Sequence, residues 1–258
     1  KNACAKAAYN GRTKIQFQGT EFAKAQLFNW SNKEPATHHE IVLPDHVDEK
    51  YNCVNYLWNE VEKIENRINS QVAMELVLAL PDDESISIED RVELTKSFVK
   101  ENFISRAFGA QINIHSPEKD EDGEEKAIKN WHAHVLVTPR RFQEDGKSFE
   151  TKKPRDLLEV KKGRVTDGPE WGKMWTHHQN QYFEEKGLSL RVDSTGIISQ
   201  KHLGPVRMRA RAFSLMEVNS IQSSLNTIES LDPKSLLKKI SETHNIFTRE
   251  DVERYLIK

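Results

Sequence analysis

Three histidines in this sequence have the side-chain type and spacing that metal chemistry requires. His132 and His134 lie two residues apart in the run WHAHVLVTP at 131–139, and its alternation predicts a strand with both imidazoles on one face. The run AQINIH at 110–115 ends in His115. If the two runs pair as a hairpin, three imidazoles converge and leave coordination positions open for water or substrate. That is the arrangement of a catalytic metal site.

Other histidine patterns limit that interpretation. Pairs spaced His-x-His also occur by accident, and most histidines are not metal ligands, so the predicted hairpin with His115 carries the argument. His177 and His178 form a rival pair, but neighbours on a helix point about 100° apart and cannot both face one ion. We expect these two to be surface or packing residues.

An acidic side chain, Glu75, interrupts the otherwise apolar run MELVLALP. A buried carboxylate at this position needs a partner, and a metal site or its histidine ligands would provide one. The alternative is a position on an edge strand that faces solvent.

The elements that must position these residues alternate along the chain. We expect helices over 1–13, 48–69, 87–108, 153–160 and 169–187, strands over 38–44, 72–81, 110–115 and 131–139, and helical structure throughout 206–258. Strand hairpins with helices packed on them predict an α+β fold around an antiparallel sheet, with a helical C-terminal extension.

Composition sets the class of protein. The chain has 258 residues, of which 36% are hydrophobic and 30% charged, which predicts a globular protein with a small core. No run approaches the roughly 18 apolar residues of a membrane span. Its cysteines, Cys4 and Cys53, form no spaced pair, which is typical of a reduced cytoplasmic protein. Because the sequence begins at Lys1 and ends without a natural stop, we interpret it as part of a longer protein.

The net charge of −2 argues weakly against a nucleic-acid partner, but the charges are segregated. The segment EKDEDGEE at 118–125 is acidic, whereas 138–165 and 201–211 are rich in lysine and arginine. Such a distribution can present a positive face to nucleic acid; the alternative is that these are solvated loop charges. The basic residues that we expect to bind DNA are Arg140, Arg141, Lys152, Lys153, Arg207 and Arg209.

Several of these runs occur in the order and spacing of a known family. NACAKAAYNGR, HHEIVLP, MELVLALP, INIH and NWHAHVLVTPRRF together resemble the MobA/MobL family of plasmid relaxases, and the last block is the most specific. With KHLGP, the resemblance covers residues 1–205, the expected nicking domain. The tail DPKSLLKKISETHNIFTREDVERYL is similar to the stretch leading into the helicase part of Ti-type TraA relaxases. Residues 206–258 would thus be a helical extension.

The resemblance implies a fold and a set of site residues. The family fold is a five-stranded antiparallel sheet with flanking helices, as in HUH-endonuclease relaxases, and carries the histidine cluster on its surface. Its nucleophile corresponds to Tyr9, its metal ligands to His115, His132 and His134, and its acidic residue to Glu75, as a base or as a residue that orients the ligands. The sequence departs from the family in lacking the strand before the tyrosine helix and in a longer, more acidic loop after His115.

The implied activity is metal-dependent, site- and strand-specific nicking of origin-of-transfer DNA. Tyr9 would attack the phosphate and give a 5′-phosphotyrosine and a free 3′-OH, with Mg²⁺ or Mn²⁺ in cells and Zn, Co or Ni also possible in vitro. The implied partners are single-stranded DNA and accessory proteins of a conjugation complex, without membrane insertion.

Two other functions remain open from the sequence. One is a metal-dependent phosphoesterase or nuclease that uses water, in which Tyr9 is structural. The other is a non-catalytic single-stranded DNA-binding module in which the histidines hold a structural zinc. Three histidines without a cysteine ligand argue against this last function, because structural zinc sites usually have four ligands rich in sulfur.

Overall fold

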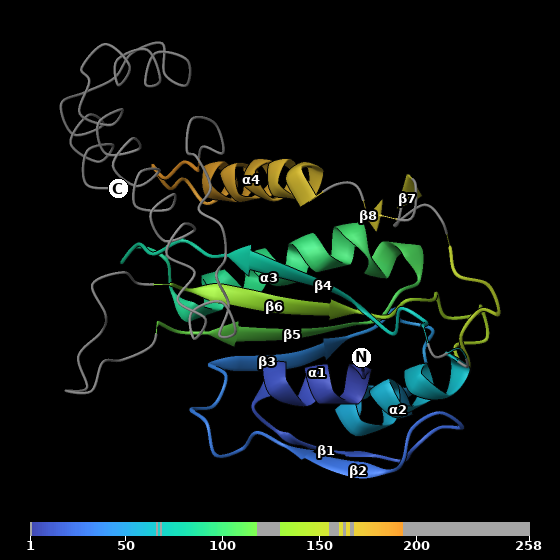
Figure 1. Ribbon diagram of the computed structural model, residues 1–258. Coiled ribbons are helices and arrows are strands. Elements are labelled where there is room, and N and C mark those ends of the chain that lie inside the picture. Colours follow the sequence, from blue (N-terminus) through green and yellow to red (C-terminus); the bar gives the residue numbers. More distant parts are fainter. Residues whose placement is uncertain are drawn as a thin grey trace, which may run out of the picture. The chain divides into compact units, whose positions relative to one another are not determined.

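The computed structural model describes residues 2–65, 67, 69–117, 130–154, 160–161, 164–165 and 168–192, all within one compact unit, Lys1–Val192. The expected boundary near 205, the extension 206–258 and the acidic segment 118–125 lie outside the described residues. Figure 1 labels the elements, which in chain order are α1 (Ala3–Gly11), β1 (Lys14–Phe17), β2 (Gln26–Asn29), β3 (His38–Val42), η1 (Glu49–Asn52), α2 (Val54–Ile64), β4 (Met74–Ala79), α3 (Ile88–Asn102), η2 (Ile104–Arg106), β5 (Ala110–His115), β6 (His132–Val137), β7 (Val160–Lys161), β8 (Arg164–Val165) and α4 (Gly168–Glu185).

A four-stranded antiparallel sheet in the order β3-β5-β6-β4 forms the centre of the fold. The α+β class with an antiparallel sheet is therefore confirmed. The central sheet has four strands among the described residues, where the family resemblance implies five. Strands β3 and β4 form its edges, so Glu75 on β4 lies on an edge strand.

One face of the sheet is apolar and is covered by α3 and α4 (Figure 1). The inward side chains alternate along each strand, as on β5, where Ala110, Ile112 and Ile114 are all buried in this core. Helix α3 begins where the sequence predicts because Ser87 and Asp90 form a reciprocal capping box. The apolar alternation of 131–139 is confirmed, since the odd-numbered residues of β6 pack into this core.

Helices α1 and α2 lie on the opposite side of the sheet, with the β1–β2 hairpin beyond them (Figure 1). A second cluster of buried side chains forms here, including Ala3, Ala7, Leu57 and Trp58. The alanines of α1 lack bulk beyond Cβ, which lets the helix approach its neighbours closely. This layer places α1, and with it Tyr9, against the polar face of the sheet.

Several boundaries differ from the expectations. The predicted helix over 48–69 is a 3-10 turn followed by α2, because Cys53 between them has an extended backbone. The helix expected over 87–108 ends at Asn102 and continues as η2. Val160, the expected last residue of the helix over 153–160, instead lies in strand β7, and residues 155–159 lie outside the described residues. The β1–β2 hairpin was not anticipated.

No helix within the described residues is both long and apolar enough to cross a membrane. Both cysteines are free, with Cys4 buried in α1 and Cys53 exposed. Burial raises the pKa of the Cys4 thiol to about 12, and the nearby Glu62 carboxylate adds to this effect.

Candidate active site

The three predicted histidines come together on the polar face of the sheet. Strands β5 and β6 pair as the expected hairpin, in a register that sets His115 directly opposite His132. The ring centres are 5.4 Å apart for His115 and His132, 5.3 Å for His115 and His134, and 5.1 Å for His132 and His134. The rival pair behaves as expected: His177 is exposed and His178 packs on Trp175.

The hydrogen bonds of each ring assign its tautomer. His132 donates from Nδ1 to the Asn130 carbonyl at 2.8 Å, and His134 donates from Nδ1 to Glu75 Oε1 at 3.0 Å. A carbonyl or ionised carboxylate can only accept, so Nδ1 carries the proton on both rings and Nε2 becomes the ligand atom. His115 has the opposite tautomer. Its Nε2 donates to the Asn10 carbonyl at 2.8 Å, so Nδ1 is left as its ligand atom.

The three imidazoles have the chemical properties of ligands for a divalent metal ion. Burial lowers the pKa of His115 to about 4, so this ring is neutral near pH 7 and has a lone pair for a metal. Oxygen acceptors behind His132 and His134 are the partners that usually hold metal-ligating histidines. As the side chains stand, no three histidine, cysteine or acidic residues of the described chain form a complete coordination group.

Glu75 connects the histidines to helix α1. Its carboxylate accepts from His134, lies 2.9 Å from Lys6 Nζ and accepts from Asn10 Nδ2 at 3.0 Å. Burial alone would raise the pKa of Glu75, but these hydrogen bonds outweigh it and lower the pKa to about 2. A carboxylate held this strongly in its ionised form is a weak proton acceptor, so its contacts favour orientation of His134 over general-base catalysis.

Helix α1 is fixed across the histidines by contacts near its C-terminal end. Besides the Asn10 bonds to His115 and Glu75, the Gln111 side-chain amide donates to the Ala7 carbonyl at 3.2 Å. Gln111 is itself held by the Trp58 indole at 2.6 Å. Tyr9 therefore has a fixed place in the wall of a cavity of about 460 Å³, which it lines together with His115, His132 and His134.

Three cationic groups surround the Tyr9 ring. The Arg12 guanidinium lies 4.6 Å from the ring centre, and Nζ of Lys33 and Lys6 lie 5.2 and 5.5 Å from it. Trp30 packs edge-on against the same ring at 5.1 Å. A concentration of positive charge in a partly enclosed site attracts an anionic substrate such as a phosphodiester.

Tyr9 also lines a second, larger cavity. It has a volume of about 950 Å³, and its lining includes Lys6, Tyr9, Trp30, Glu75 and the segment 69–73. Tyr9 lines both cavities.

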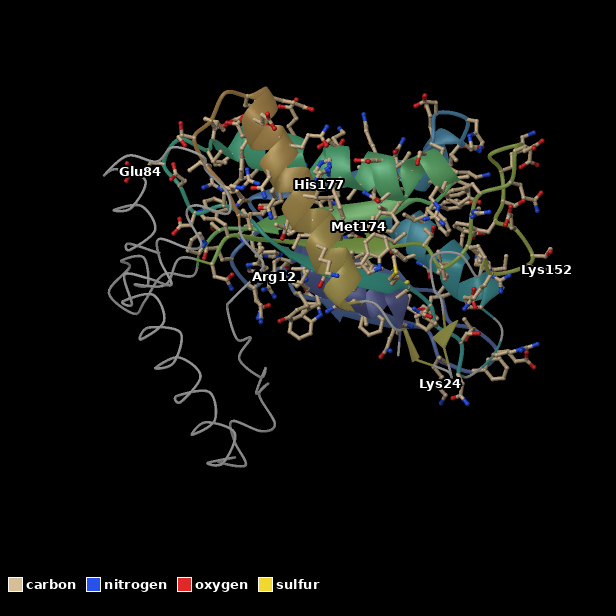
Figure 2. All side chains as sticks on the ribbon, turned by 90° about the horizontal axis from the view of Figure 1, so that it is seen from above. Arg12, Lys24, Glu84, Lys152, Met174 and His177 are labelled. Carbon is tan, nitrogen blue, oxygen red and sulfur yellow. The ribbon has the colours of Figure 1, made fainter. Side chains whose placement is uncertain are left out.

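The basic residues predicted to bind DNA lie in different settings. Arg140 Nε donates to Glu65 at 2.6 Å, and Lys153 Nζ lies 2.7 Å from the other carboxylate oxygen of Glu65, whose side chain is only 1% exposed. Lys152 is exposed and lies far from Arg12 (Figure 2). Arg141 lies over the Phe108 ring at 5.5 Å. Arg207 and Arg209 lie outside the described residues.

Sequence reasoning did not find several residues of this site. Lys6 lies three residues before Tyr9 on α1, a helical spacing that places the two side chains side by side and could have identified it. Arg12 follows the last residue of α1, so helical spacing does not predict its contact with Tyr9. Asn10 contributes through its backbone carbonyl, which accepts from His115, and through its side-chain amide, which donates to Glu75; no sequence pattern indicates either contact. Trp30 and Lys33 reach the site from beyond the β1–β2 hairpin, which the sequence analysis did not predict.

Comparisons with known proteins agree on one family. The profile described as the MobA/MobL family matches residues 1–205. The conjugal transfer protein TraA of Rhizobium radiobacter is 23% identical over 97% of this chain, which spans 25% of that protein's length. The mobilization protein MobL of Acidithiobacillus ferridurans is 21% identical over 80% of this chain and 58% of its own length.

A solved structure also resembles this chain. It is described as "Molecular Basis of Vancomycin Resistance Transfer in Staphylococcus aureus", with a TM-score of 0.59 and 31% sequence identity over 76% of this chain and 92% of the other. This likeness includes sequence as well as fold.

Proposed function

We infer that this chain, which belongs to the MobA/MobL family, is the nicking part of a conjugative DNA relaxase. The proposed reaction is metal-dependent cleavage of one DNA strand at an origin of transfer, with Tyr9 as the nucleophile. The names of its relatives, which describe conjugal transfer and mobilization, support this biological setting.

A single observation carries the proposed mechanism: Tyr9 and all three histidines line one cavity. A phosphodiester in that cavity would lie between the phenol and the imidazole cluster. The contacts from Asn10 and Lys6 hold the tyrosine helix in register with the histidines. Such fixed positioning lowers the entropic part of the barrier to attack.

The chemistry follows from these positions. The Tyr9 Oη–P bond forms while the P–O3′ bond breaks, the phenol proton leaves to solvent, and the departing 3′ oxygen takes up a proton. His115, His132 and His134 would hold a divalent ion, Mg²⁺ or Mn²⁺ in cells, which would polarise a non-bridging phosphate oxygen. Glu75 keeps His134 in the tautomer with Nε2 available. Because one phosphoester replaces another, the 3′-OH can attack the phosphotyrosine and rejoin the strand.

We propose that the DNA is single-stranded where it meets Tyr9, and that it occupies both of the cavities that Tyr9 lines. Nucleotides on one side would occupy the larger cavity beside Trp30, where bases can stack on the indole. Of the predicted basic contacts, Lys152 is exposed for backbone binding, whereas Arg140 and Lys153 are engaged by Glu65. Arg141, Arg207 and Arg209 complete the proposed path, and accessory proteins would bring the origin to the enzyme.

A denaturing gel tests this function against the alternative of hydrolysis by water. Single-stranded origin DNA labelled at its 3′ end, incubated with protein and Mn²⁺, should give a protein-linked band that survives denaturation. The same DNA labelled at its 5′ end should give a free shorter strand. Tyr9→Phe should abolish both products, and Tyr56→Phe on α2 is the matched control. Cleavage without any protein-linked band would contradict the transesterase mechanism.

A further inference from the structure

Arg12 occupies a backbone conformation that ordinarily belongs to glycine. It follows the last residue of α1 with φ 52° and ψ 39°, in the left-handed region. Arg12 and Thr13 close the helix through backbone N–H groups that donate to the Tyr9 and Ala8 carbonyls. The side chain of Arg12 takes no part in this cap. Glycine would fit this position better, so an arginine here indicates a role for its side chain.

The guanidinium of Arg12 reaches the reaction cavity. It lies 4.6 Å from the centre of the Tyr9 ring and lines the same cavity as His115, His132 and His134. Its Nη1 is buried and has no hydrogen-bond partner among the residues that the structure describes. A buried donor of a charged group is costly to leave unpaired. The position therefore fits an anionic oxygen of the substrate.

We infer that Arg12 is a catalytic residue that donates to a non-bridging oxygen of the scissile phosphate; this inference rests on the proposed function. Negative charge on the phosphate oxygens must be balanced as the Tyr9 Oη–P bond forms and the P–O3′ bond breaks. A guanidinium fixed in advance beside the phenol supplies this balance without reorganisation. It would act on the phosphate from beside Tyr9, in the same cavity that the three histidines line.

The test compares three substitutions in single-turnover formation of the covalent adduct. Arg12→Gln removes the charge, Arg12→Lys keeps the charge but loses the forked donors, and Arg12→Gly removes the side chain while suiting the backbone. The rate should fall by about 100-fold for Arg12→Gln and Arg12→Gly, with only a small change in DNA affinity. Arg12→Lys should retain part of the activity. Arg106→Gln, at the end of η2, is the charge-matched control.

Stability separates a catalytic role from a structural one. Arg12→Gly should unfold at the same temperature as the wild type or a higher one, because it relieves the left-handed strain. A second readout replaces one non-bridging oxygen of the scissile phosphate by a methyl group, which makes the linkage neutral. On that methylphosphonate the loss caused by Arg12→Gln should shrink to about tenfold or less, since there is less charge to balance.

The outcomes distinguish this inference from the proposed function. If wild-type protein forms the adduct and Arg12→Gln and Arg12→Gly form it within about threefold of its rate, Arg12 is not catalytic. Equal losses on the charged and the neutral linkage would also overturn the inference. Failure of the wild-type protein to form any adduct would instead contradict the proposed function.

Discussion

The two faces of the central sheet belong to the same strands, but their buried side chains are stabilised in different ways: by apolar packing on one face and by hydrogen bonds on the other. On β5 every residue is buried, yet Ala110, Ile112 and Ile114 enter an apolar core while Gln111, Asn113 and His115 face helix α1. Packing alone satisfies the first set. The second set needs partners, and it obtains them from side chains and carbonyls of α1, α2 and β3.

The polar face is left incompletely satisfied. Asn10 Oδ1, Asn113 Nδ2 and Arg12 Nη1 are buried there without a hydrogen-bond partner among the described residues. Each such atom lowers stability relative to a paired one. The comparison teaches that the apolar face supplies stability, whereas the polar face is organised to receive a charged ligand. Changes on the two faces should therefore have separable effects.

The largest expected effect comes from the histidines. His132→Ala combined with His134→Ala should lower the rate of cleavage by at least about 1,000-fold. Both side chains are only partly buried, so the unfolding temperature should change little. Cleavage rates and thermal melts of the double variant check this together. Full cleavage by this variant in chelator-treated buffer would contradict the metal site.

A substitution on the apolar face should lower stability and leave the cleavage activity of the folded protein unchanged. Ile112→Ala removes a side chain that is 1% exposed and should lower the free energy of unfolding by about 2–5 kcal/mol. Activity per folded molecule should stay unchanged. Val77→Ala on β4, where the side chain is 58% exposed, is the matched control and should change stability by about 0.5 kcal/mol or less. Urea titration measures both.

Glu75→Gln should have an intermediate effect. The amide still accepts from His134 but no longer pairs with Lys6 as a carboxylate, so the histidine is held less firmly. Metal affinity or cleavage should fall by about 10- to 100-fold. Calorimetric titration with Mn²⁺ separates the loss of metal from the loss of chemistry. A variant with unchanged Mn²⁺ affinity and cleavage would show that Glu75 does not orient the site.

The smallest effect concerns Glu65 and its pH dependence. Burial raises the pKa of Glu65, but Arg140 and Lys153 outweigh this and lower it. Its contribution to stability is thus present above the unfolded pKa of about 4.3 and is lost as pH falls through the lower folded value. Glu65→Gln should cost about 1–2 kcal/mol near neutral pH. The difference from wild type should shrink below about pH 4, as urea titrations would show.

Local patterns predicted much of this molecule. The histidine hairpin followed from strand alternation and from two runs close in the sequence, and α3 from its capping residues. Interactions between distant segments were not predictable. Arg140 and Lys153, which we propose as DNA contacts, also pair with Glu65, which is 75 residues away from Arg140. The left-handed conformation of Arg12 is a backbone property that its side chain disfavours, so no local preference indicates it.

The identity of the residue bound to DNA tests the central claim most directly. Adduct formed on 3′-labelled origin DNA would be digested with protease and nuclease, and the peptide carrying the residual nucleotide sequenced by mass spectrometry. The account predicts the nucleotide on Tyr9, attached through its 5′ phosphate. A nucleotide on any other residue, or an unmodified Tyr9 peptide from a fully reacted sample, would contradict it.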